Sequence, residues 1–229
     1  MNIINLKYII LFWFFSICYS SYAIERPDFL SAVAEDKITP TIQGNSVEGR
    51  TYGEATEISI QNNTGETIET VLEKGTILES RNPNTQDLVV TKDLTMRVGA
   101  YEYLDPPVNI FCIELNKNEP TIYDFYKPPS RKASGILMKL INYIDDSNLH
   151  DVRGAQLAIW SLTDGLTAEK AIFYGYGSKA DIKSGRQILK ACNINNAFTK
   201  NISTVLYLIG MILYTTLVVI ILLYFNKTR

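Results

Sequence analysis

Residues 56–72 read TEISIQNNTGETIETVL, and this stretch decides the fold class. Apolar residues alternate with polar ones in 57–61 and again in 67–72, which is the pattern of half-buried β-strands. The triplet Asn63-Thr64-Gly65 lies between the two runs and is rich in turn-forming residues. The stretch therefore predicts a β-hairpin, and with it a domain that begins as an antiparallel sheet.

Further short apolar runs of strand type continue the series toward the C-terminus. They cover residues 76–78, 88–91, 94–98 and 108–115, with Gly75, the loop 82–84 and Pro106-Pro107 between them. Short strands separated by turn residues predict a small antiparallel β-sandwich over residues 51–128. Residues 24–50 mix Pro, Gly and polar residues without a period, so they are interpreted as a loose linker.

After Pro128 and Pro129 the apolar period becomes helical, and a helical part is predicted over 129–203. Apolar residues at 136, 137, 140, 141 and 144 fall on one face of a first helix. A second helix is predicted over 152–162, ending near Gly165, and a third over 179–192. Ser178 would cap this third helix, with Asp181 three residues on. Strands first and helices second predict an α+β fold.

The first 23 residues have the order of a signal peptide. Lys7 is their only charge, an apolar run follows over residues 8–15, and Ser21 and Ala23 satisfy the small-x-small rule for cleavage. The mature chain is therefore predicted to begin at Ile24. An uncleaved signal anchor is the alternative, although the apolar run is shorter than the about 20 residues that a span needs.

The C-terminal segment 204–225 contains no charged residue and predicts a transmembrane helix. Lys227 and Arg229 follow it as a positive cytoplasmic flank within the tail 226–229. A buried core helix is the alternative. Together the two ends predict a single-pass membrane protein whose ectodomain lies outside the cytoplasm and whose C-terminus is cytoplasmic.

Composition excludes several partner and site classes. Lys and Arg number 22 against 24 Asp and Glu, so no basic excess argues for nucleic acid. The chain has one histidine, His150, and no spacing typical of a zinc site, so neither a metal nor a cofactor is predicted. Cys112 and Cys192 remain after signal cleavage, and a pair of cysteines in an oxidising compartment favours a disulfide.

The predicted second helix carries a glutamine on its apolar face. Gln156 lies among Val152, Ala155, Ile159 and Leu162, which mark the buried side. A buried amide without partners costs about 1 to 3 kcal/mol. Either backbone groups of the sheet satisfy it, or the amide is consumed in a chemical bond.

Three short motifs follow one another along the chain: FCI at 111–113, AQLAIW at 155–160 and TDG at 163–165. Together they resemble the motifs of bacterial thioester-domain surface proteins of the TQxA type. The resemblance implies that Cys112 supplies the thiol and Gln156 the acyl group of an internal thioester, with Trp160 and Asp164 as supporting core residues. The order of sheet, cysteine and Gln-x-Ala-x-Trp is also similar to uncharacterised exported bacterial domains, which implies export and fold without an activity.

Three functions remain open on this basis. The first is a surface interaction or adhesion module that binds a surface protein non-covalently, with Cys112 and Cys192 free or joined. The second is a covalent adhesin-like domain whose Cys112–Gln156 thioester is attacked by an amine-bearing ligand. The third, a hydrolytic enzyme, lacks a nucleophile with a base and an orienting group, so the chain is expected not to be an enzyme.

Overall fold

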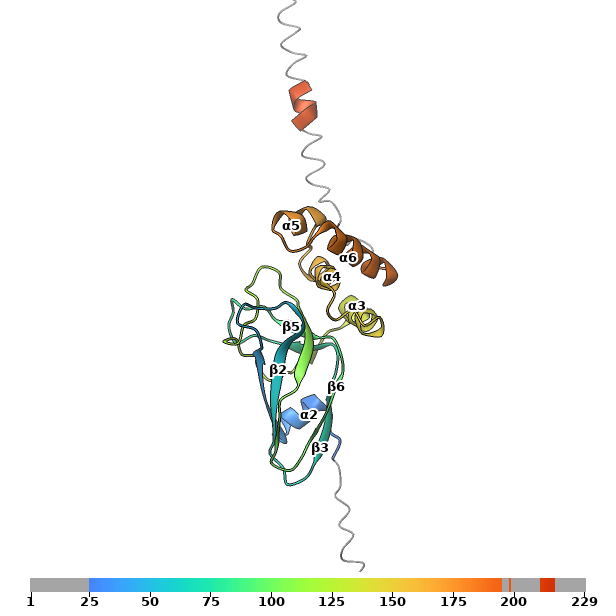
Figure 1. Ribbon diagram of the computed structural model, residues 1–229. Coiled ribbons are helices and arrows are strands. Elements are labelled where there is room, and N and C mark those ends of the chain that lie inside the picture. The colour runs from blue at the N-terminus through green and yellow to red at the C-terminus, as the bar shows by residue number, and fades with distance from the viewer. Residues whose placement is uncertain (1–24, 195–197, 199–210, 217–229) are drawn as a thin grey trace, which may run out of the picture.

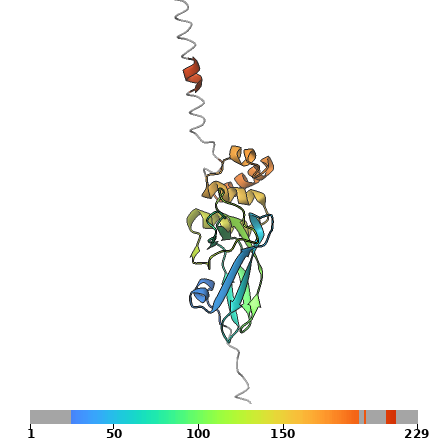
Figure 2. The same ribbon diagram turned by 90° about the vertical axis from the view of Figure 1, so that its left-hand side faces the viewer.

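The computed structural model describes residues 25–194, 198 and 211–216, and the chain is α+β as predicted. The N-terminal part contains α2 (Phe29–Ala34), β1 (Ile38–Gly44), β2 (Tyr52–Asn62), β3 (Ile68–Leu72), β4 (Thr76–Leu78), β5 (Leu88–Val90), β6 (Leu94–Val98), β7 (Tyr103–Leu104) and β8 (Pro107–Cys112). It is followed by β9 (Arg131–Lys132), α3 (Gly135–Asp146), α4 (Arg153–Thr163), α5 (Ala168–Phe173) and α6 (Lys179–Ala191). In both views α4, α5 and α6 lie beyond one end of the strands (Figures 1 and 2).

The strands form a curled antiparallel sheet and a separate two-stranded sheet. The larger sheet has the order β1-β2-β8-β5-β4-β9, with β7 paired to β2, and the smaller one joins β3 to β6. Side chains of both sheets belong to one buried core, as Ile58 and Ile60 of β2 and Ile68 and Met96 of the smaller sheet illustrate. Strand β8 is central, between β2 and β5, and its C-terminal residue is Cys112.

The hairpin predicted from residues 56–72 is wrong. Strand β3 pairs with β6, from Ile68 opposite Val98 to Leu72 opposite Leu94, and not with β2. The side chain of Asn62 occupies the corner where the chain leaves β2: its Nδ2 donates to the carbonyl oxygens of Glu66, Val98 and Gly99 at 2.7, 3.1 and 2.9 Å. These bonds satisfy the backbone at the crossover, so the turn triplet carries the chain from one sheet to the other.

The linker predicted over 24–50 is also wrong, because this segment is folded. Helix α2 and strand β1 lie within it, and β1 pairs along its whole length with β2, from Ile38 opposite Asn62 to Gly44 opposite Thr56. Ile38 and Ile42 are buried while Thr39 and Thr41 are exposed, so the segment has the strand period. Its proline, Pro40, is tolerated because β1 is an edge strand of the sheet.

The three predicted helices are present as α3, α4 and α6, and α5 was not predicted. Ser178 caps α6 as expected, since its Oγ accepts from the Asp181 backbone at 3.2 Å while the Asp181 carboxylate accepts from the Ser178 backbone at 2.8 Å. Helix α4 is the most enclosed of these helices, with every residue from Gly154 to Ser161 buried.

Helices α4 and α6 approach closely because two glycines face each other. A Cβ at Gly185 would lie 2.8 Å from the backbone oxygen of Gly154, and a Cβ at Gly154 would lie 2.6 Å from Ser184 Oγ. Such contacts are shorter than any real Cβ makes. The absence of side chains at these two positions therefore sets the spacing of the helical layer.

The predicted signal peptide, 1–23, lies outside the described residues. Of the predicted span 204–225 only residues 211–216 are described, and these are helical. Within the described ranges, no helix has both the length and the apolar character that a bilayer crossing requires.

Candidate functional site

The site begins at the backbone of Cys112, the last residue of β8, which extends one residue beyond the pairing of β8 with β2. Its N–H donates to the carbonyl oxygen of Thr51 at 2.9 Å and also to Oε1 of Gln156 at 3.0 Å. Strand β2 begins at Tyr52, opposite Phe111, so its ladder ends here. Thr51 still accepts from the Cys112 N–H, and the Gln156 side-chain amide adds a second acceptor there and supplies the donor for the Cys112 carbonyl.

Gln156 closes this pairing from helix α4. Its Nε2 donates to the carbonyl oxygen of Cys112 at 2.8 Å, so both ends of the amide bond to the same residue. The side chain is buried, and these two bonds remove the cost expected for an unpaired amide. The structure thus brings together the two residues that the resemblance pairs, and it does so through backbone groups of the sheet.

The Cys112 thiol lies in a dry, electronegative environment. Its residue has no exposed surface, and burial raises the pKa of the thiol well above its usual value, with Glu119 and Glu114 adding to the effect. The thiol therefore stays protonated. Neither the neutral thiol nor the neutral amide that bonds the Cys112 backbone carries a charge, which is why both residues can occupy core positions.

The second cysteine lies elsewhere. Cys192 caps the C-terminus of α6, and both cysteines are free thiols in the structure, so the alternative Cys112–Cys192 disulfide is not formed. Burial raises the pKa of the Cys192 thiol and the nearby Lys139 opposes the shift, whereas the charges near Cys112 are the carboxylates of Glu114 and Glu119.

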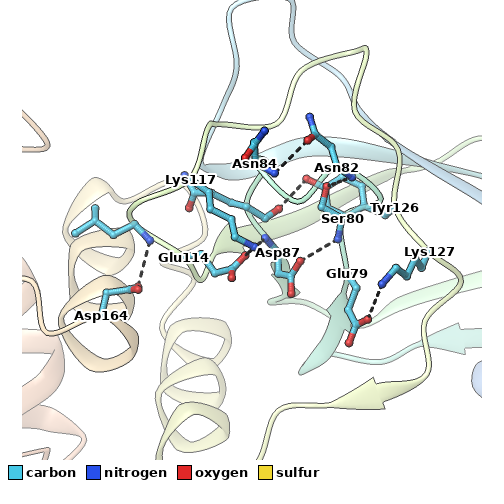
Figure 3. Close-up of polar contacts among 12 residues, drawn as sticks. Glu79, Ser80, Asn82, Asn84, Asp87, Glu114, Lys117, Tyr126, Lys127 and Asp164 are labelled. Carbon is cyan, nitrogen blue, oxygen red and sulfur yellow. Dashed lines mark hydrogen bonds and ion pairs between the residues drawn. The ribbon is translucent and has the colours of Figure 1, made fainter.

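Trp160 and Asp164 have different roles from one another. Trp160 is buried as predicted and packs against Tyr176, with 5.7 Å between ring centroids. Asp164, predicted as a core residue, is exposed, because it is the C-cap of α4. Its Oδ2 accepts from the backbone N–H of Leu115 at 3.2 Å, which ties the chain just beyond Cys112 to the end of α4 (Figure 3).

A layer of polar contacts that the sequence did not reveal holds the chain after Cys112 (Figure 3). The Glu114 carboxylate accepts from the Asp87 backbone N–H and from Lys117 Nζ, each at 2.8 Å. The buried Tyr126 hydroxyl donates to the carbonyl oxygen of Gln86 at 3.2 Å. Periodicity marks the apolar residues of a segment and not the polar partners that meet across it, so no pattern in the sequence marked these contacts.

A cavity of about 300 Å³ opens beside this layer. It is lined by Leu115, Asn116, Asp164, Leu166, Lys170, Tyr174 and Tyr176. Its wall begins three residues after Cys112, and Tyr176 connects it to Trp160. Neither Tyr174 nor Tyr176 was predicted as a site residue, because both follow α5, which the sequence did not predict.

His150 is not part of this site. It is buried, its Nδ1 lies 3.1 Å from Thr91 Oγ1, and its Nε2 lies 3.4 Å from Asp145 Oδ1. Asp145 also bonds Lys74 Nζ at 2.6 Å. Burial lowers the pKa of His150, and the Asp145 charge partly opposes this. The group joins the α3–α4 turn to loops of the sheet.

The part of the chain that the structure describes contains no set of side chains that could form a metal site. No three His, Cys, Asp or Glu side chains gather there in a way that could hold a metal ion.

The chain matches no family model, no curated protein and no solved structure. A function is therefore inferred from the hydrogen bonds between Cys112 and Gln156.

Proposed function

We propose that the domain is a covalent surface adhesin module whose reactive group is a thioester between Cys112 and Gln156. The observation that carries the proposal is the pair of hydrogen bonds from the Gln156 amide to the Cys112 backbone, which holds the acyl carbon beside the residue that bears the thiol. No other glutamine of the described chain bonds to either cysteine.

Atoms balance in two steps. The Cys112 sulfur attacks the Gln156 amide carbon, the C–N bond breaks, and the amide nitrogen leaves as ammonia with the thiol proton. A primary amine on an acceptor surface later attacks the same carbon, forms an amide with Gln156 and returns the proton to the Cys112 sulfur. The domain is consumed once per bond formed, so it is a reagent and not an enzyme.

Burial explains how such a bond would survive. Cys112 and Gln156 are almost entirely shielded from solvent, which keeps hydrolytic water away from the stored acyl group. The same burial means that an acceptor amine reaches the bond only when the chain after Cys112, held by Glu114 and Asp164, moves aside. The adjacent cavity lined by Tyr174 and Tyr176 provides the surface from which an acceptor approaches.

The topology predicted from the two ends completes this proposal. A signal peptide at 1–23 places the domain outside the cytoplasm, and a transmembrane helix at 204–225 anchors it. The uncharged character of 204–225 supports the anchor. We interpret the two sheets with their shared core as the β-sandwich of this architecture.

A non-covalent interaction module is the second candidate, and one observation favours it. The two hydrogen bonds already satisfy the Gln156 amide, and loss of ammonia would take the Nε2 donor from the Cys112 carbonyl. A buried carbonyl without a donor costs about 1 to 3 kcal/mol. In this reading the pair is purely structural.

The intact mass of the purified ectodomain separates the two candidates. Loss of one ammonia indicates the thioester, loss of two hydrogens a disulfide, and an unchanged mass free thiols. Treatment with methylamine should then add one methylamine to the thioester form. Cys192→Ala is the matched control, because it removes a buried thiol that the proposal does not use, and it should keep the ammonia loss. An ammonia loss that persists in Gln156→Ala or Cys112→Ala would overturn the assignment.

A further inference from the structure

The helical layer presents an apolar surface that nothing in the described chain covers. Ile172, Phe173 and Tyr174, at the end of α5, are 45 %, 81 % and 62 % exposed, and we refer to these three residues as the α5 patch. The patch borders a groove of about 630 Å³ between α5 and α6, lined by Ala168, Glu169, Ile172, Phe173, Lys179, Ile182 and Arg186. Consecutive exposed aromatic and aliphatic side chains beside such a groove indicate an interaction surface.

Cations border the α5 patch along α6. Lys179, Lys183, Arg186 and Lys190 are all exposed, and their spacing of four, three and four residues places them on one face of the helix. We call these four residues the α6 cation stripe. Residues 166–194 hold five cations and two carboxylates, a net charge of +3, whereas the whole chain has a net charge of −2. The surface is therefore basic as well as apolar.

The chain leaves the domain next to this surface. The backbone N–H of Phe198 donates to Ser161 Oγ at 2.9 Å, and its ring carbons lie 3.2 and 3.3 Å from the position of a Cβ at Gly185. Gly185 is buried on the face of α6 that packs against Gly154 of α4, one residue before Arg186 of the cation stripe. Thr204, where the predicted span begins, is six residues further on, which is about 20 Å at full extension.

We propose that the α5 patch and the α6 cation stripe dock onto the anionic bilayer surface in which the chain is anchored. This inference rests on the proposed C-terminal anchor. Aromatic side chains such as Phe173 and Tyr174 favour the membrane interface, and lysine and arginine are attracted to anionic headgroups. The short tether keeps α6 within reach of that interface. Docking would hold the Cys112–Gln156 site at a set height above the membrane.

The test uses the full chain reconstituted into vesicles of phosphatidylcholine and phosphatidylglycerol with brominated acyl chains, which quench tryptophan fluorescence. Phe173→Trp reports on the α5 patch. Tyr103→Trp is the matched control, since Tyr103 is 64 % exposed on β7, which pairs with the end of β2 remote from α4. After subtraction of the unsubstituted chain, quenching at 173 should exceed that at 103 by about threefold or more.

A second set of measurements tests whether docking depends on charge. Quenching at 173 should fall to the level at 103 in vesicles of phosphatidylcholine alone, and also when Lys179→Glu and Arg186→Glu are added. Arg50→Glu, an exposed charge reversal outside the helical layer, should leave the quenching unchanged. If quenching at 173 is the same with and without anionic lipid, and with and without the α6 substitutions, the electrostatic part of the proposal is overturned.

Extraction with alkaline carbonate distinguishes failure of the anchor from failure of docking. Release of the chain by carbonate overturns the anchor, and the docking with it. A chain that resists carbonate but shows equal quenching at 173 and 103 is anchored without docking. Protection of the tryptophan at 173 from aqueous acrylamide without quenching by brominated lipid assigns the patch to a protein partner and also overturns the proposal.

Discussion

Two buried polar bridges join the sheet to the helices, and they use opposite chemistry. The first connects the Gln156 amide of α4 to the backbone of Cys112 and contains no charged group. The second runs from Lys74 through Asp145 to His150 and Thr91, with an ion pair and an imidazole. The neutral bridge occupies the driest position, and the ionic one is partly exposed at Lys74 and Asp145. The comparison teaches that charge is tolerated at this junction only where water reaches it.

The largest effect is expected from breaking the neutral bridge. Compared with the free-thiol form that the structure shows, Gln156→Leu keeps the volume of the side chain but removes both hydrogen bonds, so the buried Cys112 carbonyl loses its donor. We expect the free energy of unfolding to fall by about 2 kcal/mol, as measured by urea denaturation. Gln187→Leu, an exposed glutamine on α6, is the control and should change stability little. Equal stability of the Gln156→Leu variant and the parent would mean that the two hydrogen bonds of the amide make no net contribution to the free energy of unfolding.

A smaller loss is expected from the ionic bridge. Asp145→Asn keeps the shape of the side chain but removes the charge that pairs with Lys74. Because both side chains of this pair retain about a fifth of their exposure, solvent screens the loss, which should be about 1 kcal/mol. Asp146→Asn is the matched control, an exposed neighbour on the same helix. The two variants are compared in the same urea titration. Equal midpoints would mean that the Asp145–Lys74 ion pair makes no measurable contribution to stability.

The smallest effect is a pH dependence that only the ionic bridge has. Burial lowers the pKa of His150 in the folded state, with Lys92 acting in the same direction and Asp145 and Asp151 opposing it. Below pH 6.5 the unfolded chain therefore binds the proton more readily than the folded one. Stability is fully present above about pH 6.5 and is lost as the pH falls through the lowered folded pKa.

Thermal unfolding between pH 5 and 7.5 measures this directly. His150 is the chain's single histidine, so the loss on acidification in this window should disappear in His150→Gln. Gln156→Leu should keep the wild-type slope, because its bridge has no group that titrates there. A wild-type stability that rose on acidification would contradict the direction assigned to the His150 pKa.

Local sequence patterns determined much of this protein. The helical periods after Pro129, the cap at Ser178 and the alternation in 57–61 each predicted an element that the structure contains, because helix caps and amphipathic faces depend on neighbouring residues. The apolar face of the predicted helix 152–162 also predicted that Gln156 is buried, and it is.

Tertiary structure alone decided which elements meet. Strand β3 pairs with β6, and not with the adjacent β2, because the Asn62 side chain satisfies the backbone at the crossover. Strand β1, within the predicted linker, is an edge strand because its backbone groups pair with those of β2. The Gln156 amide meets Cys112 because the β2–β8 ladder ends at Tyr52 and Phe111, which leaves the Cys112 carbonyl to a side-chain donor. Pairing between distant segments depends on which hydrogen-bonding groups the rest of the fold leaves open, and a single sequence does not record that.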